Sequence, residues 1–253
     1  MTSHRELLVS GPADARPVLI LHGGGGPATV APIARHFATG SHTLLPTHPG
    51  WNGTPRPADC TRISDLAALY LRLLHDQNLS DVLVIGSSLG GWIGAEMAAA
   101  DTERRIGQLA LIDPVGIHVE EEPVQDFFAL DARGVAEHAY HDPDRFYVDP
   151  ATLPAERVAT VRANLEALRL FSGGPAMSDP TLRRRLATVA VPTLVLWGES
   201  DRIATPAYGK HYATAFPDSR FELIAQAGHL PHLEQPAPTF ARLDAFAARQ
   251  QHL

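Results

Sequence analysis

The chain has 253 residues, a length that fits one α/β domain with an insertion as well as two smaller domains. Hydrophobic residues make up 45% of it and charged residues 19%, a globular composition that excludes an intrinsically disordered chain. The formal net charge of −7 argues against nucleic acid or anionic membranes as partners, because both favour proteins with clustered Lys and Arg.

Short apolar segments alternate with longer helical patterns along the chain. Segments such as Val18-Leu19-Ile20-Leu21 are apolar throughout, as in strands of a parallel sheet that is covered on both faces. The predicted strands are Glu6–Ser10, Pro17–Leu21, His42–Leu45, Asp81–Ile85, Gln108–Ile112, Thr193–Trp197 and Arg220–Ile224. The helical patterns between and after them include Ile63–Leu79, Leu89–Ala100, Pro206–Phe216 and Pro238–Arg249. This alternation predicts a doubly wound α/β fold.

The stretch from Gly116 to Leu186 interrupts the alternation, because it contains no convincing buried strand. Helical pieces are predicted at Val124–Tyr140, Pro154–Phe171 and Asp179–Leu186. We therefore expect residues 116–186 to form a helical insertion in a core built from residues 1–115 and 187–253.

The strongest chemical signal is Gly86-Ser87-Ser88-Leu89-Gly90-Gly91, directly after a predicted strand and before a predicted helix. It matches the G-x-S-x-G turn, in which a strained serine is exposed at a helix N-terminus and acts as a nucleophile. Ser88 is in frame, whereas Ser87 would need a glycine where Ile85 stands. A second glycine-rich segment, His22-Gly23-Gly24-Gly25-Gly26, follows another strand and leaves N–H groups free for an oxyanion hole. The residue after the nucleophile, Leu89, supplies the other N–H.

A serine nucleophile needs a base and an acid that orients the base. His229 follows the last predicted strand, and Asp201 follows the strand before it, so both lie at strand ends where open α/β sheets place their sites. The order Ser88, Asp201, His229 is the one expected for such a turn. His232 is an alternative base and Asp113 an alternative acid, since Asp113 also follows a strand.

With these motifs the chain resembles the α/β-hydrolase superfamily, in its esterase and C–C hydrolase branch, over nearly all of its length. The resemblance implies an eight-stranded, mostly parallel sheet, with residues 116–186 as a lid over the active site. It also implies that Gly24 and Leu89 donate the oxyanion N–H groups, although Gly25 stays open as an alternative to Gly24. The pattern departs from relatives at His48-Pro49-Gly50-Trp51-Asn52-Gly53-Thr54, where they often carry Asp-x-x-Gly-x-Gly-x-Ser.

The expected activity is hydrolysis of a small or medium, partly apolar carboxylic ester through an acyl-enzyme on Ser88, with no metal or organic cofactor. Alternatives are a C–C bond hydrolase of ring-fission products, a cofactor-free haloperoxidase or perhydrolase, and a non-catalytic ligand-binding module. Leu230 weakens the hypothesis of a C–C bond hydrolase, because C–C bond hydrolases of ring-fission products often carry Trp after the catalytic His. Dehalogenase and epoxide hydrolase chemistry is disfavoured, because both need a carboxylate at position 88.

Aromatic side chains in and near the insertion are expected to line an apolar substrate pocket; they are Trp92, Phe127, Phe128, Phe146 and Phe171. The single cysteine, Cys60, excludes an intramolecular disulfide and a multi-cysteine zinc site. No apolar run approaches the ~18 residues of a membrane span, and the first residues lack the apolar stretch of a signal peptide. A cytoplasmic protein acting on a small-molecule substrate is therefore expected, with no membrane partner and with homo-oligomerisation left open.

Overall fold

The computed structural model describes residues 7–249. Its centre is a seven-stranded sheet in the order β1-β3-β2-β4-β5-β8-β9, in which β1 runs antiparallel to β3 and every other neighbouring pair is parallel. The strands are β1 (Leu7–Ser10), β2 (Pro17–Leu21), β3 (His42–Pro46), β4 (Val82–Ser87), β5 (Ile106–Ile112), β8 (Thr193–Gly198) and β9 (Ser219–Ile224). The α/β class and the mostly parallel sheet are thus confirmed.

Each of the seven predicted strands is present, with ends that differ by at most two residues; Glu6 lies outside the described residues. The expectation of an eight-stranded sheet is wrong for residues 7–249, where the sheet has seven strands. The reason is that one antiparallel strand, β1, precedes the parallel part, and the chain then turns directly into β2.

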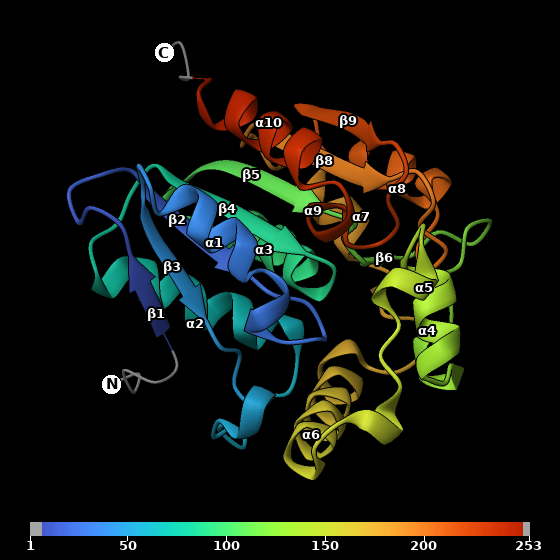
Figure 1. The fold of residues 1–253 in the computed structure, drawn as a ribbon. Coiled ribbons are helices and arrows are strands. Elements are labelled where there is room, and N and C mark those ends of the chain that lie inside the picture. Colours follow the sequence, from blue (N-terminus) through green and yellow to red (C-terminus); the bar gives the residue numbers. More distant parts are fainter. Residues whose placement is uncertain (1–6, 250–253) are drawn as a thin grey trace.

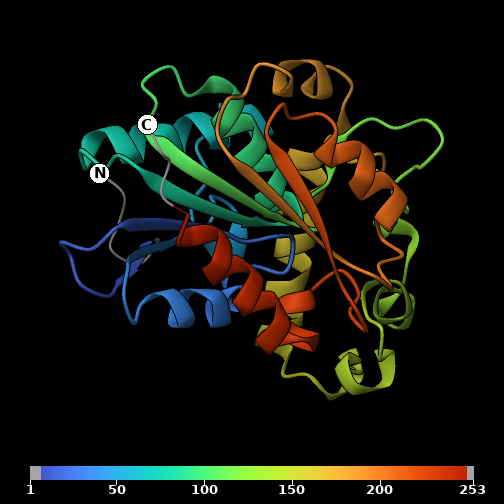
Figure 2. The same cartoon turned by 90° about the horizontal axis from the view of Figure 1, so that it is seen from above.

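Helices cover both faces of the sheet (Figure 1). Viewed from above, α10 and α1 lie on one side of the twisted strands, and α2 and α3 lie on the other (Figure 2). Each layer buries its own apolar cluster against the sheet. The helices outside the insertion are α1 (Ala31–Phe37), α2 (Ile63–Asp76), α3 (Leu89–Ala100), α8 (Pro206–Ala213), α9 (Pro231–Glu234) and α10 (Pro236–Ala247).

Local sequence explains the two helices nearest the site. In α2, Leu66, Tyr70 and Leu74 recur every four residues and are buried, while Asp65 accepts the N–H of Arg62 and closes the first turn. In α3 nearly every residue is buried, because small side chains let this helix lie between the sheet and α2.

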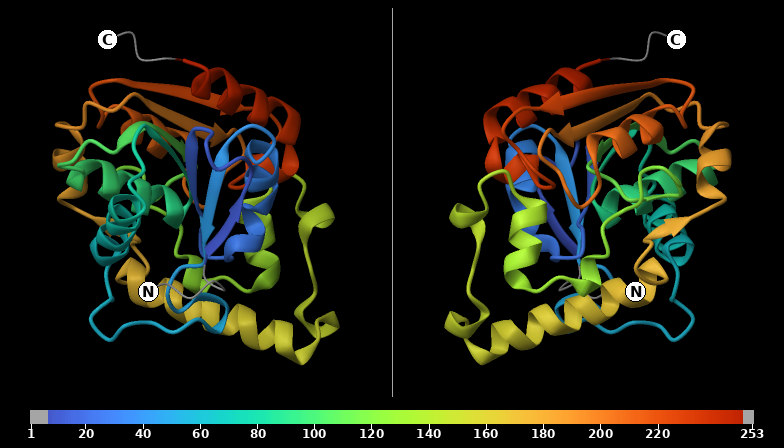
Figure 3. Two further views of the ribbon diagram at one scale, coloured as in Figure 1. Left: turned by 90° about the vertical axis from the view of Figure 1, so that its left-hand side faces the viewer. Right: turned by 90° about the vertical axis from the view of Figure 1, so that its right-hand side faces the viewer.

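The segment between β5 and β8 is mainly helical, as predicted. Its elements are β6 (Gly116–Ile117), η3 (Phe127–Ala129), α4 (Ala132–Ala139), α5 (Pro143–Phe146), η4 (Pro150–Thr152), α6 (Ala155–Ser172), β7 (Ser178–Asp179) and α7 (Leu182–Leu186). The sequence did not reveal that β6 and β7 pair as a short parallel ladder, since two residues are too few to show a strand pattern. Figure 3 shows the long helix α6, in yellow, across one end of the molecule. Within residues 7–249, no helix is both long and apolar enough to cross a bilayer.

Candidate active site

Ser88 occupies a sharp turn between β4 and α3. Its backbone angles, φ 55° and ψ −119°, are rare for a residue with a side chain, and such strain costs about 1–3 kcal/mol. The flanking glycines make the turn possible: a Cβ on Gly86 would lie 2.3 Å from the carbonyl oxygen of Gly90, and a Cβ on Gly90 would lie 2.1 Å from that of Leu21. The Ser88 N–H donates to the Ile112 carbonyl at 2.9 Å, which fixes the turn against β5 and leaves the hydroxyl partly exposed.

Three predicted residues meet above the ends of the strands. The Nε2 atom of His229 lies 2.9 Å from Ser88 Oγ, and its Nδ1 lies 2.7 Å from Asp201 Oδ2. The other carboxylate oxygen of Asp201 accepts the N–H groups of Ile203 and Ala204 at 2.8 and 3.2 Å. Nδ1–H therefore donates to Asp201, and Nε2 is free to accept the serine proton. The structure thus joins Ser88, His229 and Asp201 in one hydrogen-bonded relay.

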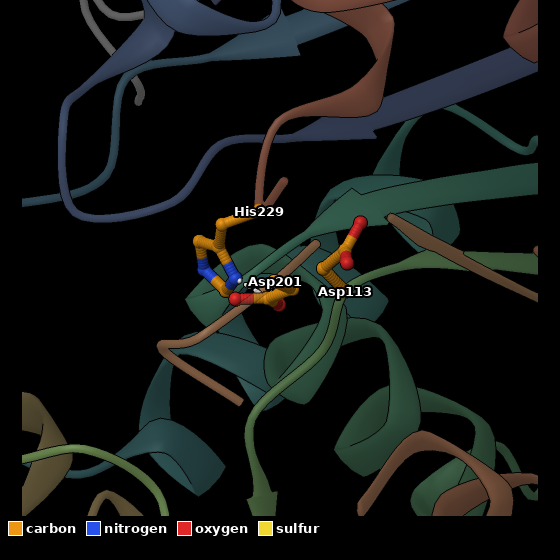
Figure 4. Close-up of side chains that lie close together, drawn as sticks. All are labelled: Asp113, Asp201 and His229. Carbon is orange, nitrogen blue, oxygen red and sulfur yellow. Dashed lines mark hydrogen bonds and ion pairs between the residues drawn. The ribbon is translucent and has the colours of Figure 1, made fainter. Parts of the chain in front are cut away.

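The two alternative residues make hydrogen bonds to other groups. His232 Nε2 donates to the Thr29 carbonyl at 3.0 Å, and burial lowers its pKa to about 4. Asp113 Oδ1 accepts the Gly198 N–H at 2.9 Å, and the carboxylate that accepts the Nδ1–H of His229 is that of Asp201. Figure 4 shows Asp113 beside Asp201 and His229; one potential ligand atom of each lies within 4.8 Å of the others. Burial, followed by the charge of Asp201, raises the pKa of Asp113 well above its usual range.

The glycine-rich loop predicted to carry one oxyanion donor passes beside the serine, and the other predicted donor, Leu89, follows the serine directly. A Cβ on Gly23 would be 3.0 Å from Ser88 Cβ, so this loop passes directly beside the nucleophile. Leu89 is the first residue of α3, and its N–H therefore has no acceptor within the helix. The Gly23 carbonyl accepts from His22 Nδ1 at 2.7 Å, and the Gly24 carbonyl accepts from Trp51 Nε1 at 2.9 Å. Both peptide planes that flank Gly24 are thereby fixed, and its N–H points away from the His22 ring.

Behind this loop lies a buried network that sequence reasoning missed. His48 donates its backbone N–H to His22 Nε2 at 3.0 Å and its Nε2–H to the His22 carbonyl at 2.9 Å. The Tyr70 hydroxyl donates to His48 Nδ1 at 2.5 Å, and the two imidazole rings stack with centroids 3.6 Å apart. Burial lowers the pKa of His48 to about 4, and burial together with the neighbouring His48 lowers that of His22. The one signal of this network in the sequence was that His48 stands where relatives often carry Asp.

Helix α6 rests on the same loop. A Cβ on Gly24 would lie 2.8 Å from Leu168 Cδ2, and Phe171 stacks on Trp51 with ring centroids 5.5 Å apart. Asn164 accepts the N–H of Asn52 at 2.7 Å and donates to its side-chain oxygen at 3.1 Å. The insertion is thus attached to η2 (Trp51–Gly53) and to the candidate oxyanion loop.

The aromatic residues predicted to bind substrate lie in different environments. Phe171 contacts Trp51, and Trp92 is buried in α3 against Gly116, where an added Cβ would lie 2.4 Å from the indole. The Arg169 guanidinium carbon lies 4.6 Å from the centre of the Phe128 ring. The Phe127 ring packs edge-on against the Phe128 ring, with 6.0 Å between the ring centroids. Phe146 stacks on Tyr140 at 4.7 Å. The ring partners of Phe127, Phe128 and Phe146 belong to the insertion itself.

Comparison with known proteins places this arrangement in a family. The model of the alpha/beta hydrolase family matches residues 18–243, and the chain therefore belongs to that family. Its fold and family are those of a hydrolase, as the sequence predicted.

Individual relatives differ in activity and length. A dihydrolipoyllysine-residue acetyltransferase component of an acetoin cleaving system from Cupriavidus necator is 28% identical over 87% of this chain, and the chain spans 60% of that relative's length. A 2-hydroxy-6-oxononadienedioate/2-hydroxy-6-oxononatrienedioate hydrolase from Pseudomonas putida is 27% identical, covering 90% of this chain and 86% of the relative. The crystal structure of a Bacillus subtilis carboxylesterase superposes with a TM-score of 0.74 at 21% identity, covering 97% of this chain and 90% of that one. At that identity the superposition shows the shared fold.

Proposed function

We propose that this protein is a serine hydrolase that cleaves small or medium, partly apolar carboxylic esters through an acyl-enzyme on Ser88. The observation that carries the proposal is the relay from Ser88 Oγ through His229 to Asp201, with both hydrogen bonds formed at 2.9 and 2.7 Å. A serine hydroxyl gains nucleophilic strength when a neighbouring base takes its proton during attack.

The reaction proceeds in two halves. Ser88 Oγ attacks the ester carbonyl, His229 Nε2 takes the hydroxyl proton, and Asp201 stabilises the imidazolium. The N–H groups of Gly24 and Leu89 bind the oxyanion, a contact whose loss typically costs about 3–4 kcal/mol of transition-state stabilisation. His229 then returns the proton to the leaving alkoxide, so that the alcohol departs. In the second half His229 deprotonates water, which attacks the acyl carbonyl; the imidazolium then returns the proton to Ser88 Oγ as the acyl–oxygen bond breaks, and the acid leaves.

The side chains around the loop support the proposed substrate class. Leu168 lies over Gly24, and Trp51, on which Phe171 stacks, contacts the Gly24 carbonyl, so apolar side chains border the candidate oxyanion loop. Apolar surface removed from water contributes about 25 cal/mol per Å² to binding. An ester with an apolar acyl or alcohol part fits this border.

A matched pair of variants tests the proposal. Ser88→Ala is expected to abolish hydrolysis of p-nitrophenyl esters and labelling by a fluorophosphonate probe. Ser87→Ala is the control, because the Ser87 hydroxyl is buried and has no hydrogen-bond partner within the described residues. Esters of graded acyl length, assayed with both variants and the parent protein, identify the preferred substrate size. Labelling of Ser88→Ala at the parent rate, or absence of all esterase activity from the parent, would refute the proposal.

A second candidate is hydrolysis of a C–C bond in a vinylogous diketone, which would use the same three residues. The Pseudomonas putida relative, with 90% of this chain covered, favours it. Leu230, which directly follows the candidate base, counts against C–C bond hydrolysis, because such hydrolases often carry Trp at this position. Turnover of a ring-fission dienoate together with inactivity on simple esters would select this second activity.

A further inference from the structure

Two carboxyl groups share one buried space beside the imidazole of His229. Asp113 follows β5 and is fully buried, and Asp201 follows β8 and is 3% exposed. One ligand atom of each lies within 4.8 Å of the other and of a ring nitrogen of His229 (Figure 4). Two carboxylates this close and this deep do not both ionise, because each charge opposes the other and neither is solvated.

The hydrogen bonds show which of the two keeps the charge. Asp201 accepts three donors, from His229 and from the N–H groups of Ile203 and Ala204. Asp113 accepts one, from Gly198, on Oδ1, while its Oδ2 is buried with no hydrogen-bond partner within the described residues. An ionised Asp113 would leave a charged oxygen unsatisfied, whereas a proton on Oδ2 removes the charge and turns that oxygen into a donor.

We propose that Asp113 is a positioning residue for the reaction: a neutral carboxylic acid whose Oδ2–H is directed at Asp201, so that the pair carries one negative charge throughout turnover. The hydrogen bond fixes the Asp201 carboxylate toward His229 and reduces its electron density. Asp113 also lies near enough to His229 to ionise and take the place of Asp201 when that charge is removed. The inference rests on the proposed serine-hydrolase mechanism.

The charged surroundings of Asp113 agree with a neutral acid. Asp201 comes from the loop after β8, His229 from the loop after β9, and Glu234 from α9. Both Asp201 and Glu234 disfavour a further negative charge, and burial acts in the same direction. Within the described residues, the Gly198 N–H is the group that favours ionisation of Asp113, and it can donate to a carboxyl oxygen whether Asp113 is neutral or ionised.

The first test compares two neutral replacements by the pH profile of kcat/KM on a p-nitrophenyl ester. Asp113→Leu removes the donor, so we expect kcat/KM to fall about tenfold, equivalent to about 1.4 kcal/mol. The acid limb should move to higher pH, because Asp201 then holds the imidazolium more strongly. Asp113→Asn keeps a donor and should recover most of the loss and the parent acid limb. If both variants move the acid limb to lower pH, Asp113 carries a charge in the parent and the proposal is wrong.

The second test addresses the replacement of Asp201. Asp201→Ala should retain at least tenfold more activity than the double variant Asp201→Ala/Asp113→Asn. Equal residual activity in the two would overturn this part of the proposal.

A measurement on the unmodified protein guards against variants that do not fold. In carbon-13 NMR of protein labelled at the aspartate carboxyl groups, one resonance should stay at the protonated position at pH 7. Titration of every aspartate below pH 5 would overturn the proposal. This readout needs no substrate, so it still decides the state of Asp113 if the parent protein hydrolyses no ester.

Discussion

The Nε1–H of Trp51 donates a hydrogen bond to the carbonyl of Gly24, with 2.9 Å between the nitrogen and the oxygen. The same indole stacks on Phe171 of α6. One side chain therefore joins the candidate oxyanion loop to the insertion, and the orientation of the Gly24–Gly25 peptide depends on it.

Removal of this donor should act on the rate more than on binding. Trp51→Phe keeps a ring for Phe171 to stack on but loses the N–H, so the Gly24 carbonyl is released. We expect kcat to fall about tenfold, less than the cost of a deleted oxyanion donor, with KM changed less than twofold. Steady-state kinetics with a melting curve provides the check. A rise in KM at unchanged kcat would show that the orientation of the Gly24–Gly25 peptide does not affect the oxyanion donors of this loop.

The insertion should control acyl length through Leu168, which is 5% exposed and lies over Gly24. Leu168→Ala opens space there, so kcat/KM for longer acyl esters should rise relative to acetate. Each newly accommodated methylene is worth about 0.8 kcal/mol, or roughly fourfold, if it contributes in the transition state. Leu165→Ala, on the exposed side of the same helix, is the control. Equal shifts in both variants would point to general loosening of α6.

Glu234 should support the loop that carries His229. Its buried carboxylate accepts the N–H groups of Gly228 at 2.6 Å, His141 at 2.9 Å and Asp142 at 3.1 Å. Glu234→Gln places an amide donor against these N–H groups in either orientation. The lost charged hydrogen bonds should destabilise the fold by about 2–3 kcal/mol and lower kcat by loosening the His229 loop. Chemical denaturation and kinetics measure the two effects, and an unchanged midpoint of unfolding would argue against this role.

The buried histidines should make the fold sensitive to acid. Burial lowers the pKa of His48 and His232 to about 4, against an unfolded value near 6.5, and lowers that of His22 as well. Between pH 6.5 and pH 4 these histidines bind protons in the unfolded chain but not in the folded chain, so the free energy of unfolding falls as the pH falls. The raised pKa of Asp113 acts in the opposite sense, because the folded chain holds a proton there.

Replacement of one histidine should therefore flatten the pH dependence of stability. In His48→Gln, the slope of the free energy of unfolding between pH 6.5 and 4 should decrease by about 1.4 kcal/mol per pH unit. Urea denaturation of the variant and the parent protein across this range gives the comparison. Parallel curves would mean that His48 titrates alike in the folded and unfolded chains.

The strands and the three relay residues could be predicted because their signals are local. Apolar runs such as Val18–Leu21 identify buried strands, and parallel strands bring Ser88, Asp201 and His229 to one edge. The support of the oxyanion loop depends on contacts distant in sequence. The helical pattern of α6 indicated its existence but not that Leu168 would lie over Gly24, and no short motif links Tyr70 to His48. The eighth strand was expected from resemblance alone, without an apolar segment to form it.

The separation of the relay along the chain has a consequence during synthesis. Ser88 and His229 are 141 residues apart, so the hydroxyl emerges from the ribosome roughly 10 s before its base, at about 5–20 residues per second. Asn164, the hydrogen-bond partner of Asn52, likewise follows it by 112 residues along the chain. A nascent chain that ends before His229 therefore carries Ser88 without the base that the proposed mechanism requires. In the proposed mechanism, hydrolysis therefore begins only when the last strand has joined the sheet, and a truncated or stalled product lacks the base and stays inactive.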